Sequence, residues 1–552
     1  MKQINFSIKN MKKQLFIIAL CTCILGAKAV NADYNVVPLP QKINAEKGAP
    51  FTLSKAVTIV YEGTDEQMKA NAQFLSDYIS QATSIRLDVI DKKDKKRTAV
   101  CLAIDPTISG KEAYRLSVNK KQINITGSTP AGVFYGIQTL RKSLPVQTSG
   151  ANVMLPAVLI EDAPRFGYRG MMLDCARHFF SVDFVKRYID IMALHNLNVF
   201  HWHLSDDQGW RIEIKSRPKL AQVASRRSGT VIGHNSIIDD STAYGGYYTQ
   251  KEAREIVEYA RLRNITVIPE IDMPGHMRAA LAAYPELGCT GGPYEVGHKW
   301  GIYTDVLCVG NEQIYPFLQD VINEIADIFP AQYLHIGGDE TPTTKWEQCP
   351  RCLALAKAQN TDIKHLQQYF TNRMEQYVAT KGKRIIGWDE ILDGKINKTA
   401  TIMSWRGVEP GSKAAALGHD VIMAPLWHAY FDFYQSEEIK HEPKAIGNYL
   451  PVAKVYEFDP APDTFSAEAK SHILGVQANL WTEYIPYTTQ AEYMILPRIA
   501  ALAEVQWTPV ERKDFDSFTK RAFRLTDLYD RYGYQYARHL WKEKQLSTGD
   551  TW

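Results

Sequence analysis

The sequence predicts an α/β fold in which a (β/α)8 TIM barrel follows a small α+β domain. Two observations carry this prediction. After residue 167 a strand-then-helix rhythm supplies eight strand candidates, and before it short β-rich runs alternate with only two helical patterns. Eight parallel strands are the number that closes such a barrel. The length of 552 residues also exceeds one ordinary compact core, so two or more domains are expected.

Eight short apolar runs supply the barrel strands. They begin at Gly170, Asn198, Ile265, Tyr333, Arg384, Thr401, Asp420 and Ile473. Amphipathic helical patterns lie between most of them, for example at 181–195, 249–264, 311–329 and 365–381. We therefore expect the barrel to occupy residues 164–510. A final segment, residues 511–552, is expected to pack as helix on the outside of the barrel.

The region before the barrel divides into two parts. Residues 33–162 contain short β-rich runs and helical patterns near 67–81 and 131–144, which indicates a small α+β domain. Residues 1–29 combine a lysine-rich start, an apolar run and the small-residue exit Ala27-Lys28-Ala29, the pattern of a signal peptide. We expect export to a bacterial periplasm or cell surface. Lipidation at Cys21 or Cys23 is the less favoured alternative, because a large residue precedes each cysteine.

The charge balance argues against a polyanionic partner. The first 29 residues hold five lysines and no acidic residue, so without them 59 basic residues stand against 61 acidic ones. A net charge near −2 gives no reason to expect nucleic acid binding. No later stretch reaches the roughly 20 apolar residues of a transmembrane helix. The sequence leaves the oligomeric state open.

Six cysteines follow the leader, and two of them form a Cys-x-x-Cys motif. Cys349-Pro350-Arg351-Cys352 has the spacing of a redox motif or a zinc half-site, but no second such pair accompanies it. We therefore expect a local disulfide or two free thiols there. Cys289 and Cys308 flank a glycine-rich loop and could be joined across it. The sequence does not decide the pairing.

Acidic, aromatic and histidine residues follow nearly every predicted barrel strand. In a (β/α)8 barrel these ends form one face, which holds the active site. Carboxylates bind sugar hydroxyls and tryptophan rings stack on the apolar faces of sugars. A single tryptophan is more often core filling, but Trp388, Trp405 and Trp481 all fall at strand ends. The pattern indicates a carbohydrate site.

Asp339 and Glu340, preceded by two glycines, form the sharpest motif. Glycine lets the backbone approach a ligand closely. The carboxyls of a two-carboxylate glycosidase flank the sugar, about 5–5.5 Å apart in retaining and about 6.5–9.5 Å apart in inverting enzymes. Sequence neighbours can hardly flank a sugar. If Glu340 is the general acid, Asp339 has another task, such as positioning a nucleophile that belongs to the substrate.

Five motifs together resemble a known family. They are Tyr168–Asp174, His201–Trp210, Pro269–His276, His335–Glu340 and Asn479–Glu483. The residues of these motifs and the order in which they occur closely resemble those of glycoside hydrolase family 20, the β-N-acetylhexosaminidases. The resemblance covers the barrel well and the N-terminal domain loosely. It implies exo-acting, retaining hydrolysis of terminal β-linked GlcNAc or GalNAc, assisted by the substrate's own acetamido group through an oxazolinium ion.

The resemblance also assigns roles to residues. Glu340 would be the acid and base, and Asp339 would orient the acetamido group. The remaining substrate contacts would come from Arg169, Trp388, Trp405, Tyr430, Asp432, Trp481 and Glu483. Asp206 and His276 would support Glu340 from behind, although His276 taken alone is as consistent with a structural histidine. Arg169 precedes the end of its strand by several residues, so only the resemblance places it in the pocket.

Two other classes of protein compete with this interpretation. His201 and His203 alternate on one strand and point to the same side, as in metal-dependent barrel hydrolases, but the remaining ligands of such a site are missing. A sugar-binding protein without activity would have no need for the acid Glu340. We therefore expect an enzyme with a glycan substrate that uses no cofactor and no metal.

Overall fold

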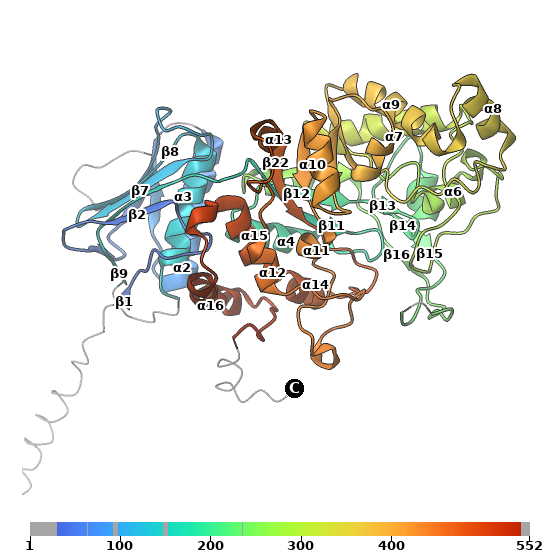
Figure 1. The fold of residues 1–552 in the computed structure, drawn as a ribbon. Coiled ribbons are helices and arrows are strands. Elements are labelled where there is room, and N and C mark those ends of the chain that lie inside the picture. Colours follow the sequence, from blue (N-terminus) through green and yellow to red (C-terminus); the bar gives the residue numbers. More distant parts are fainter. Residues whose placement is uncertain (1–29, 63–64, 92–97, 147–152, 235, 542–552) are drawn as a thin grey trace, which may run out of the picture.

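The structure is a computed structural model that describes residues 30–62, 65–91, 98–146, 153–234 and 236–541. Two bodies stand side by side, a strand-rich one formed by the N-terminal part and a larger one formed by the rest (Figure 1). The predicted signal peptide, residues 1–29, lies outside the described residues. Among those residues, no helix is both long and apolar enough to cross a bilayer.

The larger body is a closed parallel barrel of eight strands, as predicted. The strands are β11 (Tyr168–Asp174), β12 (Val199–His203), β17 (Thr266–Glu270), β18 (Tyr333–His335), β19 (Arg384–Trp388), β20 (Thr401–Ser404), β21 (Val421–Met423) and β22 (Ile473–Ala478). They are hydrogen-bonded in chain order, and β22 closes the barrel on β11. Because all eight are parallel, their carboxyl ends open on one face.

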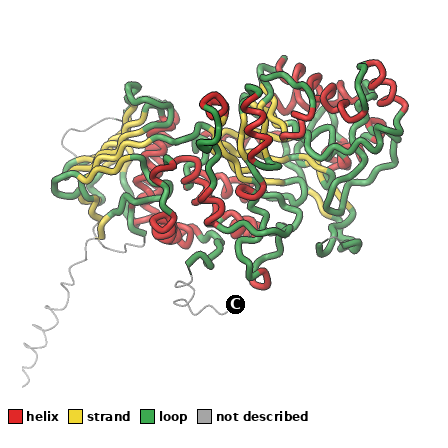
Figure 2. Tube along the Cα trace, in the orientation of Figure 1, coloured by secondary structure: helices red, strands yellow, loops and turns green. Residues whose placement is uncertain are grey.

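Helices surround the barrel (Figure 2). The main ones are α4 (Val182–Leu194), α5 (Gln250–Arg261), α7 (Ile314–Ile328), α8 (Pro350–Ala358), α9 (Leu366–Ala379), α10 (Val408–Ala416), α14 (Thr488–Ile495) and α15 (Arg498–Trp507). Their starts are fixed locally: Ser181 caps α4, and Thr249 with Glu252 forms a capping box on α5. Shorter helices are α6 (Arg278–Ala283), α11 (Leu426–Ala429), α12 (Val452–Glu457) and α13 (Ala467–His472). Helix α16 (Phe515–Tyr532) packs beside α12, where Tyr456 and Phe518 stack.

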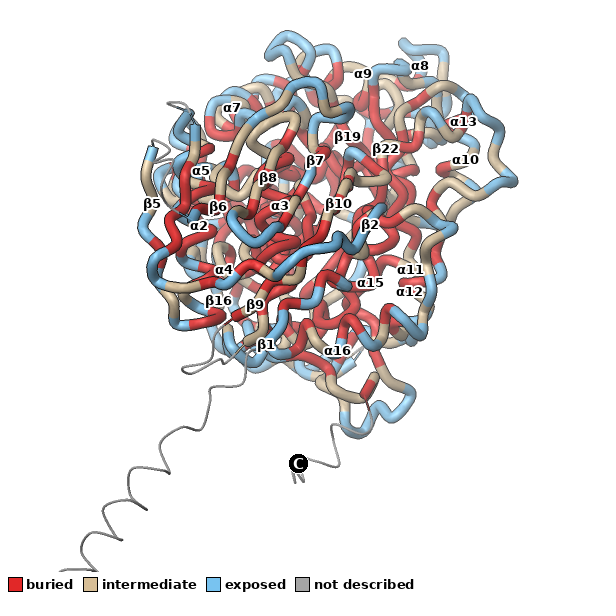
Figure 3. Tube along the Cα trace, turned by 90° about the vertical axis from the view of Figure 1, so that its left-hand side faces the viewer, coloured by how far each residue is buried: buried red, intermediate tan, exposed pale blue. Residues whose placement is uncertain are grey.

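The smaller body is built on a seven-stranded mixed sheet of order β2-β10-β7-β8-β6-β4-β5. These strands are β2 (Lys42–Ala45), β4 (Thr58–Tyr61), β5 (Asp88–Ile90), β6 (Ala99–Ile104), β7 (Tyr114–Asn119), β8 (Gln122–Gly127) and β10 (Val158–Asp162); β1 (Val30–Asn31), β3 (Phe51–Leu53) and β9 (Val153–Leu155) form a second sheet. Helices α2 (Glu66–Thr83) and α3 (Pro130–Ser143) cover the face of the large sheet that looks toward the barrel (Figure 1). Most of α3 is buried behind the strands (Figure 3).

Arg169 connects the two bodies, and its predicted role in the pocket is wrong. It is the second residue of β11, at the amino end of the strand, opposite the face where the active site of a barrel opens. Its buried guanidinium lies 2.6 Å from Glu112 and 2.9 Å from the Tyr135 hydroxyl, both in the N-terminal domain. These contacts occupy the charged group. Arg169 therefore holds the domain interface together.

Candidate active site

Side chains from four strand ends converge at the carboxyl face of the barrel. Asp174 ends β11, His203 ends β12, Glu270 ends β17 and Trp388 ends β19, and all four are buried. The closed barrel brings them together although they lie far apart in the sequence. The indole N–H of Trp388 donates to Glu270 across 2.9 Å, which fixes the ring at the floor of the site.

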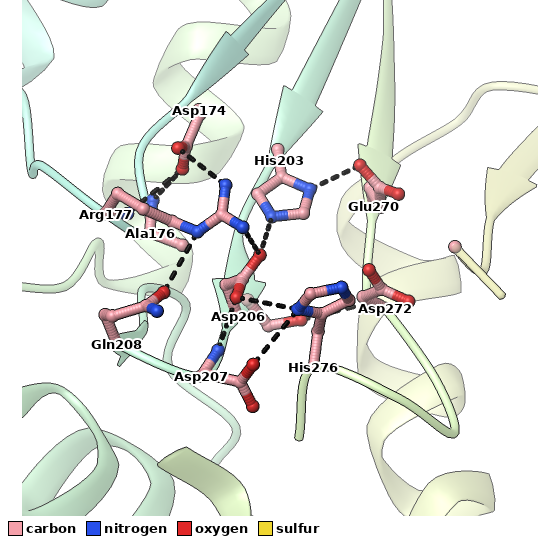
Figure 4. Close-up of polar contacts among 12 residues, drawn as sticks. Asp174, Ala176, Arg177, His203, Asp206, Asp207, Gln208, Glu270, Asp272 and His276 are labelled. Carbon is pink, nitrogen blue, oxygen red and sulfur yellow. Dashed lines mark hydrogen bonds and ion pairs between the residues drawn. The ribbon is translucent and has the colours of Figure 1, made fainter. Parts of the chain in front are cut away.

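Arg177 lies at the centre of the acidic cluster (Figure 4). Its guanidinium is 3.2 Å from Asp174, 2.9 Å from Asp206 and 3.6 Å from Glu483. It also lies over the ring of Trp481, 5.1 Å from the centroid. Arg177 is thus the arginine in the site, in place of the predicted Arg169. Its sequence signal was its place three residues beyond Asp174, in the loop that follows the strand end.

Asp339 and Glu340 approach the same edge of one imidazole. Nε2 of His276 lies 3.6 Å from Asp339 and 3.5 Å from Glu340, and Nδ1 lies 3.2 Å from Asp206 and 3.0 Å from Asp207. His276 thus lies between the predicted pair and two further carboxylates, those of Asp206 and Asp207, and Figure 4 shows its contacts with the latter two. Both members of the pair approach the same ring nitrogen.

A sharp turn creates this arrangement. Gly337 and Gly338 have φ of +64° and +93°, and a Cβ on Gly337 would lie 1.8 Å from the carboxylate of Asp272. Glycine is therefore required at this position. Glu340 has φ of +44° and His276 has φ of +49°, a region that costs a non-glycine residue roughly 1–2 kcal/mol. Such positive φ values at functional side chains are typical of catalytic sites.

The carboxyls of the site differ in exposure and in protonation. Asp339 is buried, and burial followed by the charges of Glu270 and Glu340 raises its pKa, while His276 opposes the rise. Burial and the charge of Asp339 raise the pKa of neighbouring Asp272 well above its usual range, so Asp272 holds a proton more readily. Glu340 keeps 35% of its side-chain surface exposed. Only Glu340 of the pair is open to proton exchange with a ligand and water.

His276 is held as a cation. Burial alone would lower its pKa, but the carboxylates of Asp206 and Asp207 outweigh burial, and the pKa of His276 is raised well above its usual value. The same cation, together with Arg177, lowers the pKa of Asp206 well below the usual range despite its burial. A positively charged imidazole therefore faces Asp339 and Glu340.

The alternating histidines of β12 have a structural explanation. His201 lies 2.9 Å from Glu270, His203 contacts the same carboxylate, and His335 of β18 lies 2.9 Å from it. Their charges lower the pKa of Glu270 well below its usual range despite burial. Glu270 is thus the common carboxylate neighbour of the histidines that suggested a metal-dependent hydrolase. His335 also packs against Trp388, with ring centroids 4.9 Å apart.

Four aromatic side chains, all predicted from the sequence, form a wall of the site. The rings of Trp388 and Trp481 have centroids 5.8 Å apart, and those of Trp405 and Tyr430 stack at 6.1 Å. A side-chain hydrogen bond joins Tyr430 to Trp481 and so connects the two pairs. Residues from three different strand ends and a short motif therefore make one continuous surface.

Two further predicted residues lie near this wall. Asp432 is buried, and burial followed by the charge of Glu483 raises its pKa well above the usual range. Its Oδ1 atom has no hydrogen-bond partner among the described residues. Glu483 in turn contacts Arg177 at 3.6 Å. The structure therefore gathers every predicted site residue except Arg169 in one region at the carboxyl face of the barrel.

Glu390 is a site residue for which the sequence suggested no role. Burial and the charge of Asp339 raise its pKa to about 8, and it accepts a hydrogen bond from the Trp405 indole at 2.9 Å. The sequence signal was its position after Trp388 at the end of a barrel strand. Glu390 fixes Trp405 while it lies near Asp339.

Comparisons with known proteins agree with this site. The family model described as "Glycosyl hydrolase family 20, catalytic domain" matches residues 166–510, and the model of domain 2 of the same family matches residues 33–163. A β-hexosaminidase of Porphyromonas gingivalis is 40% identical over 533 residues, which are 94% of this chain and 67% of that protein. A β-hexosaminidase of Vibrio furnissii is 38% identical over 73% of this chain and 66% of its own length. The chain thus spans about two thirds of these relatives.

Solved structures show the same architecture. The exo-β-N-acetylglucosaminidase of Vibrio harveyi in complex with N-acetylglucosamine has a TM-score of 0.82 and 32% identity, covering 93% of this chain and 80% of that one. The N-acetyl-β-hexosaminidase of Streptomyces plicatus has a TM-score of 0.79 and 33% identity, covering 91% and 96%.

The barrel, its acidic mouth and these comparisons define the chain as a glycoside hydrolase. It belongs to glycosyl hydrolase family 20, the family of the β-hexosaminidases.

Replacing His276 with Asn should shift the pH dependence of activity. The imidazolium lowers the pKa of Asp339, so its removal should raise that pKa further. We expect Asp339 to act as the charged carboxylate, so activity should be lost as pH falls through this pKa, and the acidic limb of the kcat/KM profile should move to higher pH. Profiles on a chromogenic glycoside measure this. An unchanged acidic limb in a folded variant would contradict the role of His276.

Proposed function

We propose that this chain is an exo-acting, retaining β-N-acetylhexosaminidase that releases terminal β-linked GlcNAc or GalNAc by substrate-assisted catalysis. The observation that carries the proposal is the unequal environment of Asp339 and Glu340. Asp339 is buried, no N–H group among the described residues donates to its Oδ1 atom, and the carboxyl group hydrogen-bonded to Asp339 is that of Asp272. A buried acceptor without an N–H donor fits the acetamido N–H of a substrate. Glu340, more exposed, is free to transfer protons.

In the first step the acetamido oxygen attacks the anomeric carbon and the glycosidic C–O bond breaks. Glu340 gives its proton to the leaving oxygen. The product is an oxazolinium ion, which carries positive charge beside Asp339. A preorganised carboxylate at that position stabilises the developing charge without reorganisation during the reaction.

In the second step water attacks the anomeric carbon from the side that the leaving group vacated. Glu340, now a carboxylate, takes a proton from the water, and the oxazolinium ring opens to regenerate the acetamido group. Two inversions give net retention. Nδ1 of His276 lies 3.2 Å from Asp206, and Nε2 of His276 lies 3.5 Å from Glu340. This chain of contacts supports a role for Asp206 and His276 in orienting the acid.

The surrounding residues provide binding contacts for the sugar. Trp388, Trp405 and Trp481 offer the apolar surface on which the acetamido methyl group packs. The hydroxyl of Tyr430 donates to the acetamido oxygen, and Asp432 and Glu483 accept hydrogen bonds from the outer hydroxyls. We assign the ring hydroxyls at positions 3 and 4 to Arg177 instead of Arg169, because its guanidinium lies in the site.

We also propose that the protein is exported, to a bacterial periplasm or cell surface. The lysine-rich start and the short apolar run before Ala27-Lys28-Ala29 support this. Export suits an enzyme whose glycan substrates lie outside the cytoplasm.

Two arginine variants should separate binding from folding. Arg177→Gln should lower kcat/KM on p-nitrophenyl N-acetyl-β-glucosaminide by about 10- to 100-fold, because hydrogen bonds to a charged group contribute about 1.5–3 kcal/mol. Arg169→Gln, the matched control, should leave KM unchanged but destabilise the protein by up to about 3–5 kcal/mol, because it breaks a buried ion pair. Kinetics and thermal unfolding measure both. A raised KM in Arg169→Gln would restore Arg169 to the pocket.

Glu340→Gln should test acid catalysis, because its effect on the rate should depend on whether the leaving group needs a proton. On a natural disaccharide kcat should fall by about 10²- to 10⁴-fold, the usual size of general acid assistance. On the p-nitrophenyl glycoside, whose leaving group needs no proton, bond cleavage should suffer less. Equal losses in rate on both substrates would exclude Glu340 as the acid.

Asp339→Asn should test whether Asp339 assists the acetamido group that acts as the nucleophile. Turnover should fall by about 10²- to 10³-fold, as for loss of one preorganised electrostatic group. A thiazoline mimic of the oxazolinium ion should lose affinity at the same time, measured as an inhibition constant. If the variant binds the mimic as tightly as the wild type, Asp339 does not act on the cyclised intermediate.

A further inference from the structure

Four cysteines from two separate loops meet in one cluster. Cys308 Sγ lies 3.6 Å from the sulfurs of both Cys349 and Cys352, and Cys289 Sγ lies 3.9 Å from that of Cys352. All four sulfur atoms lie within 4.8 Å of one another. The sequence favoured a local disulfide or two free thiols at Cys349 and Cys352, and it left a separate pairing of Cys289 with Cys308 open. The fold instead joins the two pairs into one group.

The spacing of the sulfurs fits a tetrahedral metal. Zinc binds thiolate sulfur at about 2.3 Å, so the sulfurs of a tetrahedral site with four thiolate ligands lie about 3.8 Å apart. Separations of 3.6, 3.6 and 3.9 Å surround this value. Disulfides would draw the atoms together in pairs at about 2.05 Å. Here Cys308 is equally near two partners, which is the geometry of a shared centre.

We propose that these four cysteines bind one Zn²⁺ ion as a structural site. The ligands are Cys289, Cys308, Cys349 and Cys352. Four thiols release four protons when they bind the ion as thiolates, and no oxidation or reduction occurs. Because all four positions are taken by sulfur, such a site is closed to substrate. The proposal does not depend on the proposed activity.

The surroundings of the cluster are built for such a centre. Cys308, Cys349 and Cys352 are buried and Cys289 is half-buried. Cys349 is the N-cap residue of helix α8 and Cys352 lies in its first turn, where the positive end of the helix dipole offsets the negative charge of thiolates. The backbone N–H of Gly310 bonds to Cys352, and a Cβ on Gly310 would lie 2.4 Å from the backbone of Arg351. Glycine thus lets the loop close on the Cys-x-x-Cys turn.

Arg351, between the two cysteines of that turn, supplies a compensating charge. Its guanidinium donates to the carbonyl of Gly288 at 3.0 Å, directly before Cys289. A Zn²⁺ ion with four thiolates carries a net charge of −2, and the cation at Arg351 offsets part of it. The same contact ties the two cysteine-bearing loops together.

The ion would fix the loops that carry the catalytic groups. Cys289 and Cys308 belong to the loop after β17, which also carries His276, and Cys349 follows Glu340 in the loop after β18. Between them, the Trp346 indole donates to the Leu307 carbonyl at 2.9 Å, and the Leu307 N–H donates to the Pro274 carbonyl at 3.0 Å. A metal at the cluster would therefore hold His276 and Glu340 in register through two backbone segments.

Metal analysis of the wild-type full chain tests the proposal. The protein is purified without a metal-affinity column or chelator, and elemental analysis should find one zinc per chain. Alkylation of the denatured protein without reductant, followed by mass spectrometry, should modify all four cysteines. A disulfide between any two of them would overturn the proposal. So would four free thiols that take up no zinc when the ion is titrated into the folded protein.

Cysteine variants assign the ligands. Cys308→Ser should lose at least nine tenths of the bound zinc and unfold at a lower temperature, whereas Cys101→Ser, outside the cluster, should keep one zinc per chain. Because Cys308 is fully buried, the half-buried Cys289→Ser provides a second variant in case the first fails to fold. Replacement of zinc by Co²⁺ should give the charge-transfer and visible bands of a tetrahedral thiolate site, and octahedral spectra would contradict it. An inactive wild type that still holds zinc would refute only the proposed activity.

Discussion

The surplus of buried negative charge at the mouth of the barrel is the constraint on which the site depends. Carboxyls from several strand ends gather there, whereas the main cations facing them are Arg177 and His276. An isolated buried carboxylate is costly, so each must find a cation, a hydrogen bond or a proton. The three solutions occur side by side within one cluster.

These three solutions give the carboxyls different properties. Asp206 lies against Arg177 and His276 and its pKa is lowered, whereas Asp272 is buried beside Asp339 and its pKa is raised. Asp339 lies between these cases, with a buried oxygen to which no N–H group of the described chain donates. A negative site with an unfilled acceptor favours a ligand that offers an N–H group and gains positive charge. The electrostatics of the site thus favours the chemistry that we propose.

Two loops position the charged side chains of this acidic site. One turns at His276 and the other at Glu340, both with positive φ, so the backbone must be held from outside the site. The packing of Gly337 against Asp272 supplies part of that support, and the cysteine cluster would supply more at the far ends of the same loops. A structural metal there would stabilise the strained arrangement of these two turns.

The sequence by itself determined the barrel and most of the site. Strand periodicity identified the eight strands, and the residues at their ends or in the loops that follow, such as Trp388 and Glu483, identified the pocket because parallel strands end on one face. The adjacency of Asp339 and Glu340 already excluded a pair that flanks a sugar. Each of these features depends on a short segment of the chain, so the local sequence pattern is enough to predict it.

Only the tertiary structure decided which long-range partners meet. Arg169 and Arg177 lie eight residues apart, but one is at the amino end of β11 and binds Glu112 of another domain, while the other follows its carboxyl end and enters the site. The cysteines likewise formed one group and not two pairs, because loops after different strands approach each other. Such contacts depend on the closure of the barrel and the docking of domains, and no local spacing encodes them.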